Sequence, residues 1–126
     1  IVDTAESVHF GRTEALEPLD ALTELLLQPL PRTEALRLGI SVWYAYLARA
    51  TADPQIGEIL AKASRGALEY AARLLECAGA PAQEAERLIA LSNGLAQAAM
   101  VGAVTVEEAA HVLHQEVDSL KALSRG

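Results

Sequence analysis

Proline and glycine divide this chain into five stretches with the apolar spacing of helices, and this punctuation restricts its fold more than any other feature. Proline lacks the backbone donor that a helix interior needs, and glycine ends helices at little cost. The pattern predicts helices over residues 18–28, 32–51, 54–78 and 81–101, and another from residue 105 onward. No stretch alternates like a strand. We therefore expect an all-α bundle of about five helices.

Two of these helices have explicit start signals. Asp53 can accept backbone N–H groups as an N-cap, and Pro54 is tolerated in the first turn. Thr105 and Glu108 have the spacing of a capping box.

The stretch 32–51 is apolar over an unusually wide surface. It carries two stripes, which are Leu36, Ile40, Trp43 and Leu47, and Leu38, Val42, Ala45 and Tyr46. A surface this wide predicts a helix buried on more than one side, so we expect this helix to be the central one.

Composition limits the classes of protein. The 126 residues are 52% apolar but only 4% aromatic, because alanine and leucine dominate, and these residues favour helices. The net charge is −7 with only two lysines, which argues against nucleic-acid binding by these residues. We see no uninterrupted apolar stretch of about 20 residues and no basic leader. The one cysteine, Cys77, permits no internal disulfide, which is compatible with a reducing compartment. We expect a cytoplasmic protein without membrane contact.

Reactive residues are few. The sequence shows neither a glycine-rich phosphate loop nor a nucleophile elbow, and Cys77 is typical of a small core residue. His111 and His114 are three residues apart and, with Glu107, have a spacing that can ligate a metal. We prefer the alternative, in which they form a polar interface or surface pair. We expect no enzyme, no catalytic residue, no metal and no cofactor.

A small-molecule pocket is the better-supported site. Trp43, Tyr44, Tyr46 and Tyr70 are four of the five aromatic residues, in a chain otherwise rich in alanine. Such a bundle can leave an apolar cavity with a few polar groups. The alternative is that these aromatics fill the core. The residues we expect to bind a ligand are Trp43, Tyr44, Tyr46, Leu47, Tyr70, Leu74, Asn93 and Gln97.

The last two helices carry more apolar residues than one small bundle needs. We expect a homodimer through Leu88, Leu91, Gly94, Leu95, Val106, Leu113, Val117 and Leu120, with Gly94 permitting close approach. Apolar stripes alone do not separate burial within one chain from burial between two chains.

An ordered series of segments resembles a known family. The segments are 25–31 (LLLQPLP), 34–37 (EALR), 42–46 (VWYAY), Asp53-Pro54, 91–95 (LSNGL) and 102–109 (GAVTVEEA). Together they are similar to the C-terminal domain of TetR-family transcriptional regulators of the BetI-like kind, over residues 19–123. Asn93 stands where that family commonly has Asp.

The resemblance implies an antiparallel helical bundle that binds a small, largely apolar effector. It also implies that the last two helices pair with their copies across a two-fold axis. The function expected from it is a ligand-responsive regulator, a repressor. The alternative is a stand-alone helical dimerisation or adaptor module that binds no ligand.

The N-terminus is similar to two separate parts of that family's DNA-binding domain. Residues 1–6 (IVDTAE) resemble its first helix, and residues 9–16 (HFGRTEAL) resemble the segment after its recognition helix, with Thr13 in place of the usual Lys. We interpret residues 1–16 as remnants of a helix-turn-helix domain that would hold operator DNA, and residues 17–126 as the ligand-binding and dimerisation domain. An ordinary amphipathic N-terminal helix is the alternative.

Overall fold

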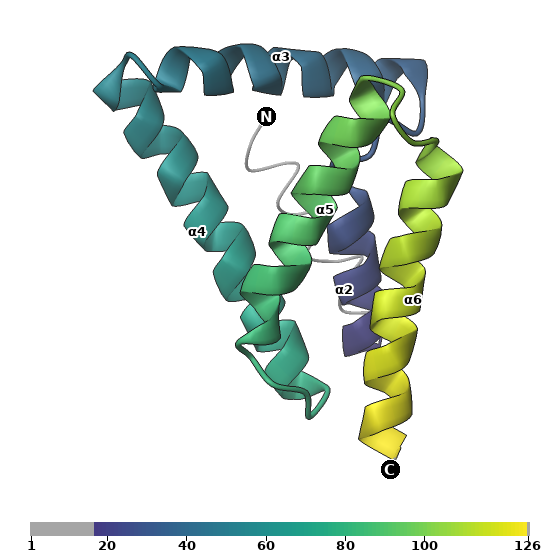
Figure 1. Cartoon of the computed structure of the whole chain (residues 1–126). Helices are drawn as coiled ribbons and strands as arrows, with labels where there is room; N and C mark the ends of the chain where they lie inside the picture. Colours follow the sequence, from purple (N-terminus) through teal and green to yellow (C-terminus); the bar gives the residue numbers. More distant parts are fainter. Residues whose placement is uncertain (1–16, 126) are drawn as a thin grey trace.

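The computed structural model describes residues 17–125, which form five helices and, within that range, no strand. They are α2 (Pro18–Leu27), α3 (Glu34–Ala50), α4 (Pro54–Cys77), α5 (Glu84–Met100) and α6 (Val106–Arg125) (Figure 1). The predicted all-α bundle is confirmed. The largest boundary difference is at α5, which begins at Glu84 rather than at residue 81, because residues 82 and 83 form a turn.

Side-chain caps begin three of the helices. Thr33 Oγ1 accepts the Leu36 N–H at 3.1 Å before α3, and Asp53 Oδ1 accepts the Gln55 N–H at 3.0 Å before α4. These contacts satisfy backbone donors that have no partner inside the helix.

The predicted capping box before α6 forms in modified geometry. The Glu108 N–H donates to Thr105 Oγ1 at 3.0 Å, as the spacing predicts. The Glu108 carboxylate, however, accepts the Thr105 hydroxyl at 3.2 Å, where a standard capping box would use the Thr105 backbone N–H.

Glycines in the left-handed region end α4 and α5. Gly79 has φ 75° and Gly102 has φ 77°. After α5, the Ala103 N–H donates to the Ala98 carbonyl at 2.9 Å, and the Gly102 N–H donates to the Ala99 carbonyl at 3.2 Å. Both helices therefore end in the glycine turn that the sequence predicts.

The hydrophobic core surrounds α2, which packs against α4, α5 and α6. Five of the ten residues of α2 are buried, and Leu30 beyond it is fully buried. The partners come from the C-terminal half of α4 and from the inner sides of α5 and α6: Ala71, Leu75, Ala85, Leu88, Ala96, Ala109, Leu113, Val117 and Leu120. Lys121 of α6 also reaches Asp20 of α2 at 3.0 Å.

Helix α3 lies outside this core, so the expectation that it is the central helix is wrong. None of its residues is buried. It runs across one end of the molecule, and α3, α4 and α5 form the sides of a triangle (Figure 1). The physical reason is that an apolar stripe shows that a helix has apolar surface to bury. It does not show which other helix packs against that surface. The shorter helix α2 takes the central place.

Candidate functional site

The aromatic residues of α3 form the first part of the candidate site. Trp43, Tyr46 and Leu47 remain 41%, 46% and 44% exposed, and Leu36, on the same side of the helix, is 40% exposed. The alternative drawn from the sequence, in which the aromatic residues fill the core, is therefore wrong for the aromatic residues of α3. We call these four residues the aromatic face of α3.

Tyr44 lies beside this face and is half-buried. Its burial raises the pKa of the phenol above the ordinary value of 10.0, because the charged phenolate loses hydration. The neutral hydroxyl is therefore the favoured form, and it can both donate and accept a hydrogen bond.

Helix α4 supplies Tyr70 and Leu74, which are both partly buried. Leu74 packs against the hydrophobic core. The Arg73 guanidinium lies 5.8 Å from the centre of the Tyr70 ring, within the range of a cation–π interaction. Tyr70 therefore adds an aromatic group on α4, the helix that contacts α3.

The two predicted amides lie on α5, and both are exposed. Asn93 directly follows buried Ser92. Gln97 comes three residues after Gly94, and residues at that spacing share one side of a helix. Gln97 is thus on the outer side of α5 together with Gly94. The structure spreads the eight predicted ligand residues over three helices, with the aromatic ones concentrated on α3.

The eight residues expected at a dimer interface fall into two groups. Leu88, Leu113, Val117 and Leu120 are buried in the core of this one chain, so their side chains have almost no surface left for a partner. Leu91, Leu95 and Val106 are partly buried against that core, and Gly94 is exposed. Burial within the chain thus accounts for half of the set.

The outer side of α5 carries small residues. Ala90, Gly94 and Ala98 recur every four residues, followed by Val101, which is 78% exposed. A Cβ atom added at Gly94 would meet nothing within 4 Å, so the space outside this glycine is open within the chain. We call these four residues the small-residue face of α5. It permits the backbone of another helix to approach closely.

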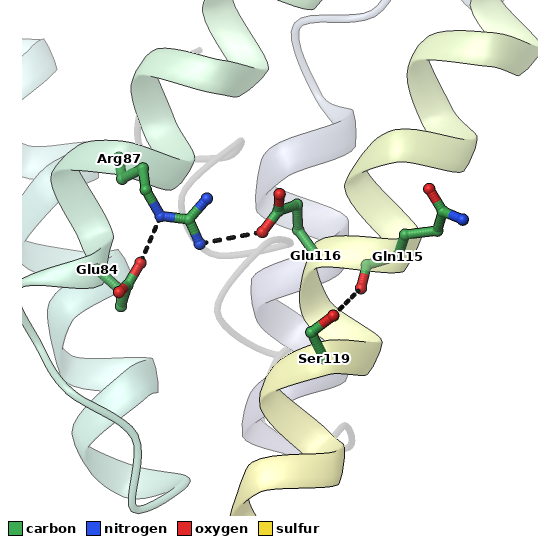
Figure 2. Close-up of polar contacts among 5 residues, drawn as sticks. All are labelled: Glu84, Arg87, Gln115, Glu116 and Ser119. Atoms are coloured by element: carbon green, nitrogen blue, oxygen red, sulfur yellow. Dashed lines mark hydrogen bonds and ion pairs between the residues drawn. The ribbon is translucent and has the colours of Figure 1, made fainter.

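An ion-pair cluster joins α5 to α6 (Figure 2). Arg87 Nε lies 2.6 Å from the Glu84 carboxylate, and Arg87 Nη2 lies 3.0 Å from the Glu116 carboxylate. Both carboxylates raise the pKa of Arg87 above its usual range. Because the arginine is half-exposed, the cluster contributes little to the stability of the fold.

Two further polar contacts link elements that are distant in sequence, and the sequence reasoning missed both. The Ser92 hydroxyl donates to the Leu26 carbonyl at 2.6 Å inside the core. Arg37 Nη2 donates to the Met100 carbonyl at 2.8 Å. The sequence did contain a signal for Ser92, because it is the one hydroxyl residue in the charge-free stretch 88–100, and a polar side chain in such a stretch indicates a buried hydrogen bond. For Arg37 no local pattern identifies a partner 63 residues away.

Among the described residues, no three His, Cys, Asp or Glu side chains gather closely enough to hold a metal ion. His111 and His114 are exposed. Cys77 is also exposed, so the expectation that it is a small core residue is wrong. In the same part of the chain, no helix is both long and apolar enough to cross a membrane. The expected remnants in residues 1–16 lie outside the described residues.

Comparison with known proteins identifies the domain. A family model described as the C-terminal domain of BetI-type transcriptional repressors matches residues 18–122, which include all of α2, α3, α4 and α5 and most of α6. No curated protein and no solved structure matches the chain.

Proposed function

Because the chain belongs to the BetI-type transcriptional repressors of the TetR family through their C-terminal domain, we propose that it is the effector-binding and dimerisation part of a repressor. A regulator of this kind makes and breaks no bond. An effector changes the relative stability of two arrangements of the dimer, and this works only through its different affinity for the two. Each arrangement would set the separation of two DNA-binding heads.

The aromatic face of α3 is the observation that carries this proposal. A helix of 17 residues with none buried leaves Trp43, Tyr46 and Leu47 more than two-fifths exposed. Large apolar side chains exposed together on one helix are typical of a binding surface. We propose that a small, largely apolar effector covers this face, with Tyr44 and Tyr70 as hydrogen-bonding groups and Leu74 and Asn93 at its edge.

The dimer that we propose uses the outer sides of α5 and α6. The small-residue face of α5 supports this choice, because Ala90, Gly94 and Ala98 leave room for a second helix. Leu91, Leu95 and Val106 lie at the border between the core and this surface. The four leucine and valine residues that are buried within the chain would support the interface from behind and would not contact the partner.

Operator DNA would be bound by the family's N-terminal domain and not by the helices described here. The net charge of −7 opposes contact between this chain and a polyanion. A regulator of operator DNA works where the DNA is, so we propose the cytoplasm as its location.

The test is a thermal-shift screen of the purified chain against small apolar metabolites. A ligand that binds only the folded state at a hundredfold excess over its Kd adds about 2.7 kcal/mol of stability. We expect at least one compound to raise the melting temperature, and Trp43→Ala to abolish the rise. Leu38→Ala is the matched control, because Leu38 is on α3 but 71% exposed and outside the aromatic face.

Two results would contradict the proposal. If no compound stabilises the chain, the alternative of a dimerisation module without a ligand is favoured. If Trp43→Ala and Leu38→Ala retain the same stabilisation, an effector binds elsewhere in the molecule.

A further inference from the structure

The C-terminal end of α5 has one carbonyl that its own turn does not satisfy. The carbonyls of Gln97, Ala98 and Ala99 accept the N–H groups of Val101, Ala103 and Gly102. The Met100 carbonyl is the next along the chain, and it accepts Arg37 Nη2 at 2.8 Å. A charged donor at the negative end of a helix forms a favourable hydrogen bond. The contact therefore completes the end of α5 from another helix.

Helix α3 has few other attachments to the rest of the described structure. It packs against α4, and its end approaches α4 so closely that a Cβ atom at Gly57 would lie 3.3 Å from the Ala50 carbonyl. Its other side-chain hydrogen bonds are local, such as Ser41 to the Arg37 carbonyl. Among the described residues, Arg37 forms the one side-chain hydrogen bond that leaves α3 for a distant helix.

Arg37 is also poorly placed to stabilise α3 itself. It comes three residues after Glu34, at the end of the first helical turn. A cation near a helix N-terminus is opposed by the helix dipole. The intrinsic effect of replacing Arg37 is therefore a more stable α3, whereas loss of the contact with Met100 would make α3 less restrained. The two effects have opposite signs, and an experiment can separate them.

We propose that Arg37 is a positioning residue that holds α3 against the C-terminal end of α5. This role of Arg37 has a consequence that rests on the proposed function. An effector that shifts α3 would act directly on α5, which carries the proposed dimer surface. By linkage, dimerisation would act on the effector site to the same extent.

Amide hydrogen exchange on the purified chain tests the proposal without any ligand. We expect Arg37→Ala to raise the exchange rates of residues 37–45 about 2- to 10-fold, the range for loss of a typical hydrogen bond, because this contact is exposed and water competes for its donor. The amides of residues 101–103 at the end of α5 should exchange faster as well, by roughly twofold. Arg37→Met, which keeps the aliphatic stem and removes the donor, should behave in the same way.

Arg49→Ala is the matched control, because it removes the same charge from the same helix. It should loosen at most the last turn of α3 and leave residues 101–103 unchanged. The proposal is overturned if Arg37→Ala slows exchange in α3, if residues 101–103 do not respond, or if Arg37→Met matches the unsubstituted chain. Failure of the proposed function would appear only in the ligand screen, so the two failures are distinguishable.

Discussion

Replacing Ser92 with alanine should destabilise the folded chain, because it removes the donor that satisfies a buried carbonyl. Helix α2 ends at two prolines, Pro29 and Pro31, which have no backbone N–H. In a continuing helix, the Leu26 carbonyl would accept the N–H of Leu30, but this group donates to the Leu27 carbonyl at 3.1 Å. The Ser92 hydroxyl donates to Leu26 instead, at 2.6 Å, from a side chain that is 1% exposed.

The size of the effect follows from three contributions. Leaving a buried carbonyl without its donor costs about 1–3 kcal/mol. Alanine favours a helix over serine by about 0.5 kcal/mol, which offsets part of the loss. The cavity contribution is small, because only one oxygen atom is removed. The net loss is about 0.5–2.5 kcal/mol, or a fall in melting temperature of roughly 2–12 °C for a chain of this size.

Urea unfolding followed by far-ultraviolet circular dichroism, at one fixed protein concentration, measures this loss. Ser119→Ala is the control: its hydroxyl donates to the Gln115 carbonyl of its own helix at 3.0 Å, and it is exposed (Figure 2). That variant should stay within about 0.5 kcal/mol of the unsubstituted chain. Equal free energies of unfolding for the two variants would refute the reasoning, since burial of the carbonyl would then not matter.

Three other predictions concern the dimer, the ion-pair cluster and pH. Gly94→Arg should give a folded monomer in analytical ultracentrifugation. Gly66→Arg is the control, because Gly66 is a helical glycine with equally open space around it, and this variant should stay dimeric. If Gly94→Arg is also dimeric, the interface lies elsewhere. Arg87→Ala should lower the free energy of unfolding by only about 0.5 kcal/mol, since the pair is exposed, and a loss of several kcal/mol in a urea titration would contradict that. Burial of the neutral Tyr44 phenol contributes to the free energy of unfolding, and this contribution is fully present below the ordinary phenol pKa. It should be lost as the pH rises through the elevated pKa of Tyr44. Tyr44→Phe should abolish this component of the alkaline unfolding curve, and an unchanged curve would count against it.

The helices were predictable because their ends are fixed by neighbouring residues. Asp53 before Pro54 and Thr105 before Glu108 identify the starts of α4 and α6 from a few consecutive positions. Gly79 and Gly102 identify two ends in the same way. Such signals depend on local backbone chemistry, so the sequence contains them completely.

The arrangement of the helices was less predictable, because it depends on which apolar surfaces meet. Trp43 and Leu47 have the spacing of core residues but are exposed, whereas Leu22 and Leu26 on the shorter helix are fully buried. The same limitation applies to the candidate sites. Val117 was expected at the dimer interface, yet it is 1% exposed and belongs to the core of this chain.

Because α3 lies outside the core, the residues proposed to recognise the effector on this helix are separate from the residues that stabilise the fold. Substitutions in a core change stability by several kcal/mol, whereas those at exposed positions usually change it by less than about 0.5 kcal/mol. Since no residue of α3 is buried, the α3 side chains proposed to recognise the effector can vary while the core around α2 stays intact. Recognition can therefore diversify among descendants of such a domain without passing through unfolded intermediates, and an engineer can randomise the aromatic face of α3 on a constant scaffold.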